Sequence, residues 1–220
     1  MLVAAQAGAQ VHVDVGAEVG AMKRFSSDRP PGGPDAGFGP VLEVHGHVAI
    51  LPFVRAGVYF THDIAPVPGI TAREITTGGF RLKVAPPLRS GRFRTWAFAG
   101  FGYAGVYAPA YQATLPFGAA GAPAATTVSA SGGSYFEVPL GIGVGYKLRR
   151  REYFGGRSPG GGELTCELGS RFGFGFQGSL YGEDGGRAAF VSGSPQEQRV
   201  PKQGNDVFAL ALSLGYSFDL

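Results

Sequence analysis

The C-terminal stretch, residues 205–220, alternates large apolar residues with small or polar ones. The large residues are Phe208, Leu210, Leu212, Leu214, Tyr216, Phe218 and Leu220. The residues between them are Val207, Ala209, Ala211, Ser213, Gly215 and Ser217. Because successive side chains of a β-strand point to opposite faces, this pattern predicts one long strand with a wholly apolar face. A lipid-facing strand needs such a face, so the pattern favours a transmembrane β-barrel.

The end of this strand resembles the assembly signal of bacterial outer-membrane barrels. Members of that family close with a polar residue, then a Gly, then two hydrophobic residues one residue apart. Ser213, Gly215, Phe218 and Leu220 fit these positions in register. Leu220 departs from the pattern, because the family most often ends in Phe or Trp. The resemblance implies that the barrel-assembly machinery is a partner during insertion.

Length and composition fit one large β domain. The chain has 220 residues, with 38 Gly, 17 Phe and 9 Tyr, which suits strands, tight turns and aromatic girdles at membrane interfaces. It has no run of about 18 apolar residues, so no transmembrane helix is expected. The single cysteine, Cys166, excludes an internal disulfide and a cysteine-based metal cluster. The net charge of +3 is too small to imply nucleic acid as a partner.

The same alternation recurs along the chain and predicts an all-β fold of eight antiparallel strands. The expected strands lie at about 10–22, 41–50, 53–61, 72–84, 93–107, 135–148, 163–177 and 205–220. The connections after the first, third, fifth and seventh strands are the longer ones. That rhythm predicts an up-and-down transmembrane barrel with long extracellular loops, shorter periplasmic turns and both termini in the periplasm.

Some local features are less regular. Strand 93–107 is apolar on both faces, so its orientation stays open. Strand 163–177 is expected to place Phe176 on the apolar face. Glu74 falls on the apolar face of its strand, which predicts a bulge or an exit from the bilayer. The charge-free connection 108–133 is expected to be a loop that either folds into the barrel mouth, contacts lipid or a partner, or stays disordered.

The face opposite the apolar one carries charges of both signs, together with many glycines. Its polar residues are Asp14, Glu18, Glu43, His45, His47, Arg55, Arg81, Lys83, Glu137, Lys147, Glu167 and Arg171. Side chains just fill the interior of an eight-stranded barrel, and opposite charges can pair there. We therefore expect a lumen blocked by a polar network. A soluble lipocalin-like carrier would turn its apolar face inward, and glycines would be wasteful on its solvated surface.

Residues 10–220 form a single barrel domain in this interpretation. Residues 1–9 are either the remnant of a signal peptide or a flexible N-terminus, because Ala5-Gln6-Ala7 resembles a cleavage site but the apolar piece is short. After Gln10 the whole chain resembles the OmpA-type and OmpX-type small barrels or the porin-like opacity family. The resemblance implies a monomer in the outer membrane of a Gram-negative bacterium, surrounded by lipid and lipopolysaccharide.

These observations predict a function carried by surface loops, in adhesion, binding or envelope integrity. The alternative is an OmpW-like channel for small or hydrophobic compounds. Phe60-Thr61-His62-Asp63 invites comparison with outer-membrane lipid A deacylases, which use a His and a Ser two residues later. Position 64 is Ile here, so we expect no enzyme. His45 and His47 face the lumen together and could hold a metal with Glu43, but no further ligand is evident, so we expect neither metal nor cofactor.

Overall fold

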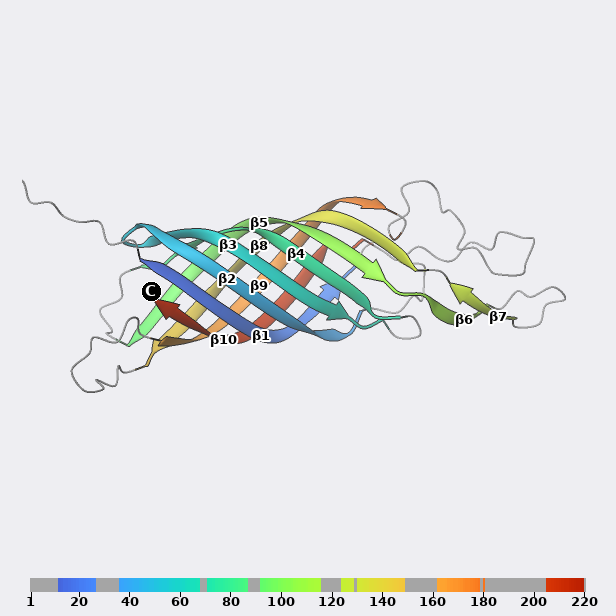
Figure 1. Cartoon of the computed structure of the whole chain (residues 1–220), viewed down its shortest axis with the longest axis horizontal. Helices are drawn as coiled ribbons and strands as arrows, with labels where there is room; N and C mark the ends of the chain where they lie inside the picture. The colour runs from blue at the N-terminus through green and yellow to red at the C-terminus, as the bar shows by residue number, and fades with distance from the viewer. Residues whose placement is uncertain are drawn as a thin grey trace, which may run out of the picture.

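The computed structural model describes residues 12–26, 36–67, 71–86, 92–115, 124–128, 130–148, 162–178, 180 and 205–219. Eight antiparallel strands form a closed barrel in the order β1-β10-β9-β8-β5-β4-β3-β2 (Figure 1). They are β1 (Val13–Phe25), β2 (Phe38–Leu51), β3 (Val54–Ala65), β4 (Arg73–Val84), β5 (Phe93–Ala108), β8 (Ser131–Lys147), β9 (Gly162–Gly178) and β10 (Phe208–Asp219). The predicted eight-stranded antiparallel up-and-down barrel is confirmed.

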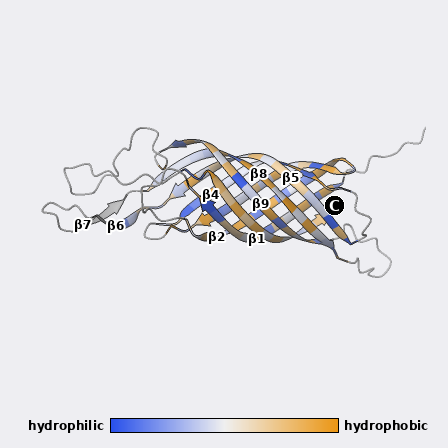
Figure 2. Cartoon of the chain, turned by 180° about the vertical axis from the view of Figure 1, so that it is seen from behind, coloured by the Kyte–Doolittle hydropathy of each residue, from blue (hydrophilic) through white to orange (hydrophobic). Residues whose placement is uncertain are grey.

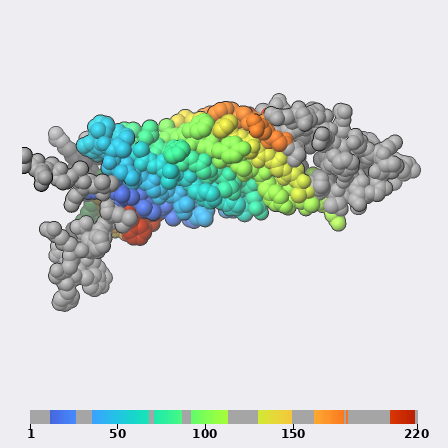
Figure 3. All heavy atoms as spheres, turned by 45° about the horizontal axis from the view of Figure 1, so that its top comes forward, coloured from blue at the N-terminus to red at the C-terminus, as the bar shows by residue number. Residues whose placement is uncertain are grey.

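The strand pairs also fix the tilt of the strands. Following paired residues once around the barrel, from Val13 through β2, β3, β4, β5, β8, β9 and β10, leads back to Lys23 on β1. The return is ten residues further along the strand than the start. Such a stagger requires strands inclined by roughly 35–45° to the barrel axis. The oblique strands lie side by side as one wall in the space-filling view (Figure 3).

The outer wall is apolar. Leu210, Leu212 and Leu214 are 43%, 55% and 61% exposed, so the apolar row of the last strand points away from the axis, as predicted. Every other barrel strand also exposes large hydrophobic side chains, and apolar residues recur along the ribbons in Figure 2. A soluble barrel would have to hide these side chains, whereas a bilayer accepts them. None of the described residues belongs to a helix that could span a membrane.

The two ends of the barrel differ. The C-terminus lies at one end, which we call the base, and the opposite end is called the mouth (Figure 1). A two-stranded hairpin, β6 (Tyr111–Leu115) and β7 (Ala124–Val128), projects beyond the mouth. The prediction that all of 108–133 is a loop is therefore wrong. Residue types that favour strands stand at Tyr111, Thr114, Thr126, Thr127 and Val128 of this hairpin.

Near the mouth the two-residue periodicity breaks in one strand. The pairing of β8 with β9 shifts between Ser134 and Phe136, and Gly175 adopts a positive φ of 67°. This extra residue is a β-bulge, and it reverses which face the next side chains occupy. Phe176 therefore packs on the inner cluster of the mouth, and its predicted outward direction is wrong. Glu74 is exposed on the outer wall, and β4 pairs with both neighbours without a register shift, so the predicted bulge is absent there.

Candidate functional site

The interior of the barrel is the chemically dense part of the molecule. Of the polar residues expected there, the structure buries Asp14, Glu18, Glu43, His45, His47, Arg81, Lys83, Glu137, Glu167 and Arg171. Arg55 is half-buried and bonded to this group. Lys147 differs, because it is exposed at the end of β8. Its strand position has inward parity, but the strand stops there and the side chain meets solvent at the base.

Asp14 organises the layer nearest the base. Its Oδ2 accepts a hydrogen bond from Arg55 Nη1 at 2.6 Å, and its Oδ1 lies 3.0 Å from His47 Nδ1. The other ring nitrogen of His47, Nε2, accepts a hydrogen bond from Arg81 Nε at 3.4 Å. The neutral imidazole thus donates to the carboxylate and accepts from the guanidinium, which joins the base to the middle of the barrel.

Glu167 forms ion pairs with two basic side chains, Arg81 and Lys83, in the middle of the barrel. Its Oε2 accepts from Arg81 Nη1 at 3.0 Å, and its Oε1 lies 3.1 Å from Lys83 Nζ. The indole Nε1 of Trp96 donates to the same Oε1 at 2.8 Å. Arg81 Nη1 also lies 2.7 Å from Glu43 Oε1. Each buried charge here has an opposite charge within contact, as a low-dielectric interior requires.

Trp96 settles the orientation of β5, which the sequence left open. Trp96 and Phe98 are buried inside the barrel, whereas Phe101 and Tyr103 are exposed outside. The inward rings need space on β8. An added Cβ at Gly143 would lie 2.3 Å from the Trp96 ring, and one at Gly141 would lie 2.4 Å from Phe98. Two glycines on the neighbouring strand therefore accommodate the two large rings.

Arg171 crosses the barrel above this layer. From β9 its Nη1 donates to Glu137 on β8 at 2.6 Å and to Thr61 Oγ1 on β3 at 3.1 Å. Its Nη2 donates to Glu43 on β2 at 3.3 Å. In the strand order β9 and β3 lie on opposite sides of the barrel, so one guanidinium ties together walls that share no backbone hydrogen bond.

A second arginine, Arg24, performs the same role closer to the mouth. It donates to both carboxylate oxygens of Asp63, at 2.7 and 2.8 Å, and to the hydroxyl of Tyr135 at 2.7 Å. Its Nη1 lies 3.6 Å from Glu137, which links it to Arg171. The sequence interpretation missed Arg24 and Asp63, since it ended the first strand at Met22 and placed Asp63 in a loop. The two-residue parity, continued for two more residues, would have found Arg24.

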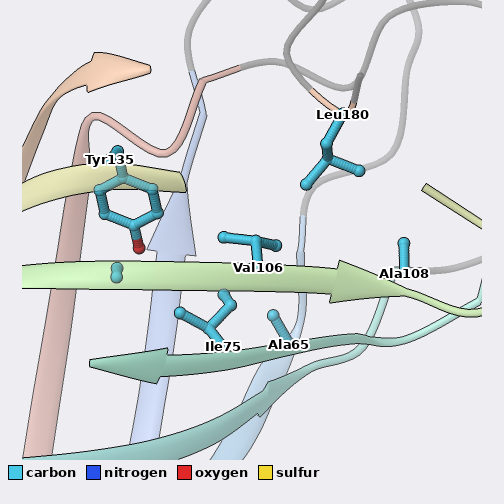
Figure 4. Packing of buried hydrophobic residues seen from close by; sticks show 7 residues of the cluster. Ala65, Ile75, Val106, Ala108, Tyr135 and Leu180 are labelled. Carbon is cyan, nitrogen blue, oxygen red and sulfur yellow. The ribbon is translucent and has the colours of Figure 1, made fainter. Parts of the chain in front are cut away.

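The mouth itself has an apolar inner lining. Its members, which we call the mouth cluster, are Ala65, Ile75, Ala104, Val106, Ala108, Tyr135 and Leu180, and Phe176 packs against them. Leu180 follows β9 and directs its side chain toward Val106 in Figure 4. Its backbone N–H donates to Gly132 O at 3.1 Å. A single ion pair, Arg73 with Asp206 at 3.0 Å, joins opposite walls at this end among the described residues.

The predicted assembly-signal residues have interior roles as well. The Ser213 hydroxyl donates to Glu18 Oε2 at 2.5 Å, and the Thr165 hydroxyl donates to Glu18 Oε1 at 3.1 Å. An added Cβ at Gly215 would lie 2.3 Å from the carbonyl oxygen of Ala17, so the neighbouring strand leaves no room there. Phe218 is 52% exposed on the outer wall. Leu220 and residues 1–9 lie outside the described residues.

The histidine pair does not meet the requirements of a metal site. Asp14, His45 and His47 place one ligand atom each within 4.8 Å of one another. Lys83 Nζ lies 3.4 Å from His45 Nε2, and Arg81 donates to His47 Nε2. A divalent cation bound to His45 Nε2 or His47 Nε2 would lie next to the positive charges of Lys83 and Arg81, which would repel it. The predicted third ligand, Glu43, lies 3.5 Å from His45 but also pairs with Arg81.

The histidine of the deacylase comparison lies on the outer wall. His62 Nδ1 is 3.0 Å from the Thr76 hydroxyl on β4. Asp63, its neighbour in sequence, points inward to Arg24 and cannot orient the imidazole. Ile64 is exposed at the position where the family has its Ser. His62 and Thr76 are directly paired residues in the β3–β4 ladder, so their contact is an ordinary cross-strand hydrogen bond on the outer wall.

Little free space remains in the middle of the lumen. A cavity there, lined by residues that include Glu43, Arg81, Glu167 and Arg171, has a volume of about 20 Å³. That volume holds about one water molecule.

No protein-family model matches the chain, and no characterised protein matches its sequence. Among solved structures it is similar to the neisserial surface protein A (NspA), with 12% identity and a TM-score of 0.53 over 94% of this chain and 97% of that chain. A major outer membrane protein from Thermus thermophilus aligns over 94% of this chain and 99% of that chain, with 15% identity and a TM-score of 0.45.

The likeness to the neisserial protein shows the fold. A closed antiparallel barrel with an apolar outer wall and a charged interior is the architecture of outer-membrane proteins. The predicted class, an integral outer-membrane barrel, is thereby confirmed.

Proposed function

We propose that this outer-membrane barrel is closed by its own side chains and acts through the segments that project from its mouth. In this proposal the barrel is a rigid anchor, and adhesion, binding or support of the envelope falls to the mouth end. Its surroundings are outer-membrane lipid and lipopolysaccharide, and the barrel-assembly machinery is its partner during insertion.

The cross-barrel ion pairs carry the first half of the proposal. Arg171 reaches Glu137, Glu43 and Thr61, and Arg81 reaches Glu43 and Glu167. Opening a path would separate several buried charges from their partners at once. Each such separation costs several kcal/mol, so it will rarely occur spontaneously.

Conductance in a planar bilayer tests the closed lumen. We expect the wild-type protein to give no steady current. A double variant, Arg171→Ser with Glu137→Ser, removes the guanidinium that reaches across the barrel to Glu43 and Thr61, together with its carboxylate partner on the neighbouring strand. The two changes leave no lone charge between these two positions, and the variant should give small steady steps. A heat-dependent shift on a gel verifies that both proteins are folded. Steady conductance of the wild type would contradict the closed lumen.

The projecting hairpin supports the second half of the proposal. β6 and β7 extend past the end of the barrel, where an external partner can reach them (Figure 1). Replacing residues 109–130 by a short turn should leave the barrel folded and non-conducting but lower the attachment of expressing cells to host or matrix surfaces. Unchanged attachment on every surface tested would remove the hairpin from this role.

The apolar lining of the mouth favours a second candidate, an OmpW-like channel for hydrophobic compounds. Ile75, Val106 and Leu180 line the lumen where a polar channel would have polar residues. The rate at which an apolar fluorescent dye enters proteoliposomes distinguishes the closed barrel from the channel. The closed-barrel proposal predicts the same loading rate with and without protein, whereas a faster rate that Leu180→Trp abolishes would favour the channel.

We propose no catalytic role. The single hydroxyl–imidazole pair described above, Thr76 with His62, faces outward from the barrel wall. The nearest aspartate in sequence, Asp63, forms an ion pair with Arg24 inside the barrel. A nucleophile needs an activated base and a pocket for its substrate. Unchanged lipid A acylation in cells expressing the protein is the expected result, and deacylation that His62→Ala abolishes would contradict it.

A further inference from the structure

The small cavity in the middle of the lumen is not satisfied by the protein alone. Three of the residues that line it carry a buried side-chain atom without a hydrogen-bond partner: Glu43 Oε1, Tyr59 Oη and Arg81 Nη2. Glu43 Oε1 pairs in charge with Arg81 Nη1, but that contact lacks hydrogen-bond geometry. All three side chains are at least nine-tenths buried. Buried polar groups in folded proteins are almost always bonded to protein or to ordered water, so this concentration of unbonded atoms needs an explanation.

The cavity has the size and polarity of a water site. Its volume is about 20 Å³, and a buried water needs about 10–15 Å³ and two to four polar partners. An ammonium or metal ion would meet the guanidinium groups of Arg81 and Arg171, and an anion would meet the carboxylates of Glu43 and Glu167. A neutral molecule that both donates and accepts fits this mixed lining.

We propose that one ordered water molecule occupies this cavity and bonds to Arg81 and Glu43, with Tyr59 as a third partner within the same lining. The water completes the hydrogen bonding of the cross-barrel network. It is a fixed part of the closed lumen, isolated from bulk solvent by the ion pairs above and below it. The middle of the barrel is therefore closed by a hydrated network.

Gly169 offers a test whose two outcomes have opposite signs. It lines the cavity, and an added Cβ would approach nothing closer than Phe98 Cζ at 3.3 Å. If the cavity is empty, the Phe98 ring can shift by a few tenths of an ångström toward the void to accept the methyl. The filled space and the loss of a strand glycine should then make the barrel more stable. If water is present, the methyl displaces it and leaves the polar atoms unsatisfied, so the folding equilibrium constant should fall by about tenfold.

Two further variants control for other effects of the substitution. Gly46→Ala places a methyl where the nearest atom is Asp14 O at 3.9 Å, which reports the general effect of Gly→Ala in a strand. Gly169→Ser supplies a hydroxyl in place of the water and should restore much of the loss. Urea titrations followed by the fluorescence of Trp96, the single tryptophan, measure all three.

A crystal structure at a resolution that shows ordered solvent gives the direct readout. We expect one solvent peak within hydrogen-bond distance of Arg81 Nη2 and Glu43 Oε1, and no peak in Gly169→Ala. An empty cavity, a halide in place of water, or a stabilised Gly169→Ala variant would overturn the proposal.

Discussion

The middle of the lumen and its mouth are lined by different chemistry. In the middle, Arg81 and Arg171 pair with carboxylates on strands that are not their neighbours, Glu43 and Glu167. At the mouth, Ile75, Val106 and Leu180 pack as an apolar cluster (Figure 4). In a low-dielectric interior, losing one partner of an ion pair leaves the other charge buried and uncompensated, which is strongly destabilising. In apolar packing, the cost of a truncation grows with the volume of the cavity that it leaves. We infer that the middle fixes the closed state, and that the mouth cluster holds Leu180 against the inner wall.

The largest effect is expected where one charge satisfies several partners. Arg171→Ala leaves Glu137 buried without its 2.6 Å partner, and we expect a loss of about 3–5 kcal/mol in the free energy of unfolding. Urea titration in lipid vesicles, followed by Trp96 fluorescence, measures the loss. Combining Arg171→Met with Glu137→Gln should cost less than the sum of the two single changes. Additive costs would show that the pair is not coupled.

The mouth should respond to lost volume. Ile75 is fully buried in the mouth cluster, so Ile75→Ala should lower the free energy of unfolding by about 2–3 kcal/mol. The same titration measures it. Ile75→Val should cost about 1 kcal/mol. If the Ala variant opened a steady conductance, the division of roles between middle and mouth would be wrong.

Arg24 lies between the middle of the lumen and the mouth, and its guanidinium bonds Asp63 and Tyr135 at once. Changing this guanidinium while keeping its charge should have a smaller effect on stability. Arg24→Lys keeps the charge but cannot bond both Asp63 oxygens and the Tyr135 hydroxyl at once. We expect a cost of about 1–2 kcal/mol. A Tyr135→Phe variant is the matched control, since it removes only the hydroxyl bond. Equal costs for the two variants would mean that the bidentate pair contributes nothing.

The smallest effect is expected one residue away from Ile75. Glu74 is the second residue of β4 and is exposed on the outer wall. Glu74→Gln should therefore change stability by no more than about 0.5 kcal/mol. The comparison with Ile75→Ala separates inner from outer wall within two consecutive residues. A large cost for Glu74→Gln would indicate a contact that the described residues do not make.

Much of this architecture follows from two-residue periodicity. Strand positions, the closing strand and the inward placement of residues such as Arg81 and Glu137 could be predicted, because a wall between lipid and a charged interior separates the two faces strictly. The periodicity cannot give what crosses the barrel, since partners such as Arg171 and Thr61 are 110 residues apart in sequence. The periodicity also fails to predict side-chain direction where both faces of the wall are apolar.

The mouth illustrates that failure. The mouth cluster is apolar, so residues on the inner and outer faces of the wall have the same character in the sequence. The bulge at Gly175 then turns Phe176 to the inner face. The orientation of β5 was open for the same reason. Trp96 and Phe98 are inward because glycines on β8 make space for them, a property of the neighbouring strand. The Lys147 prediction failed because parity does not say where a strand ends.

The central claim, that apolar side chains cover the outside of the wall, can be tested at Cys166, the only cysteine of the chain. It lies on β9 between Leu164 and Leu168, which are 50% and 53% exposed on the outer wall. A nitroxide attached to Cys166 in a lipid bilayer should collide more often with dissolved oxygen than with a water-soluble nickel chelate. The reverse order would place this face in water and contradict the account.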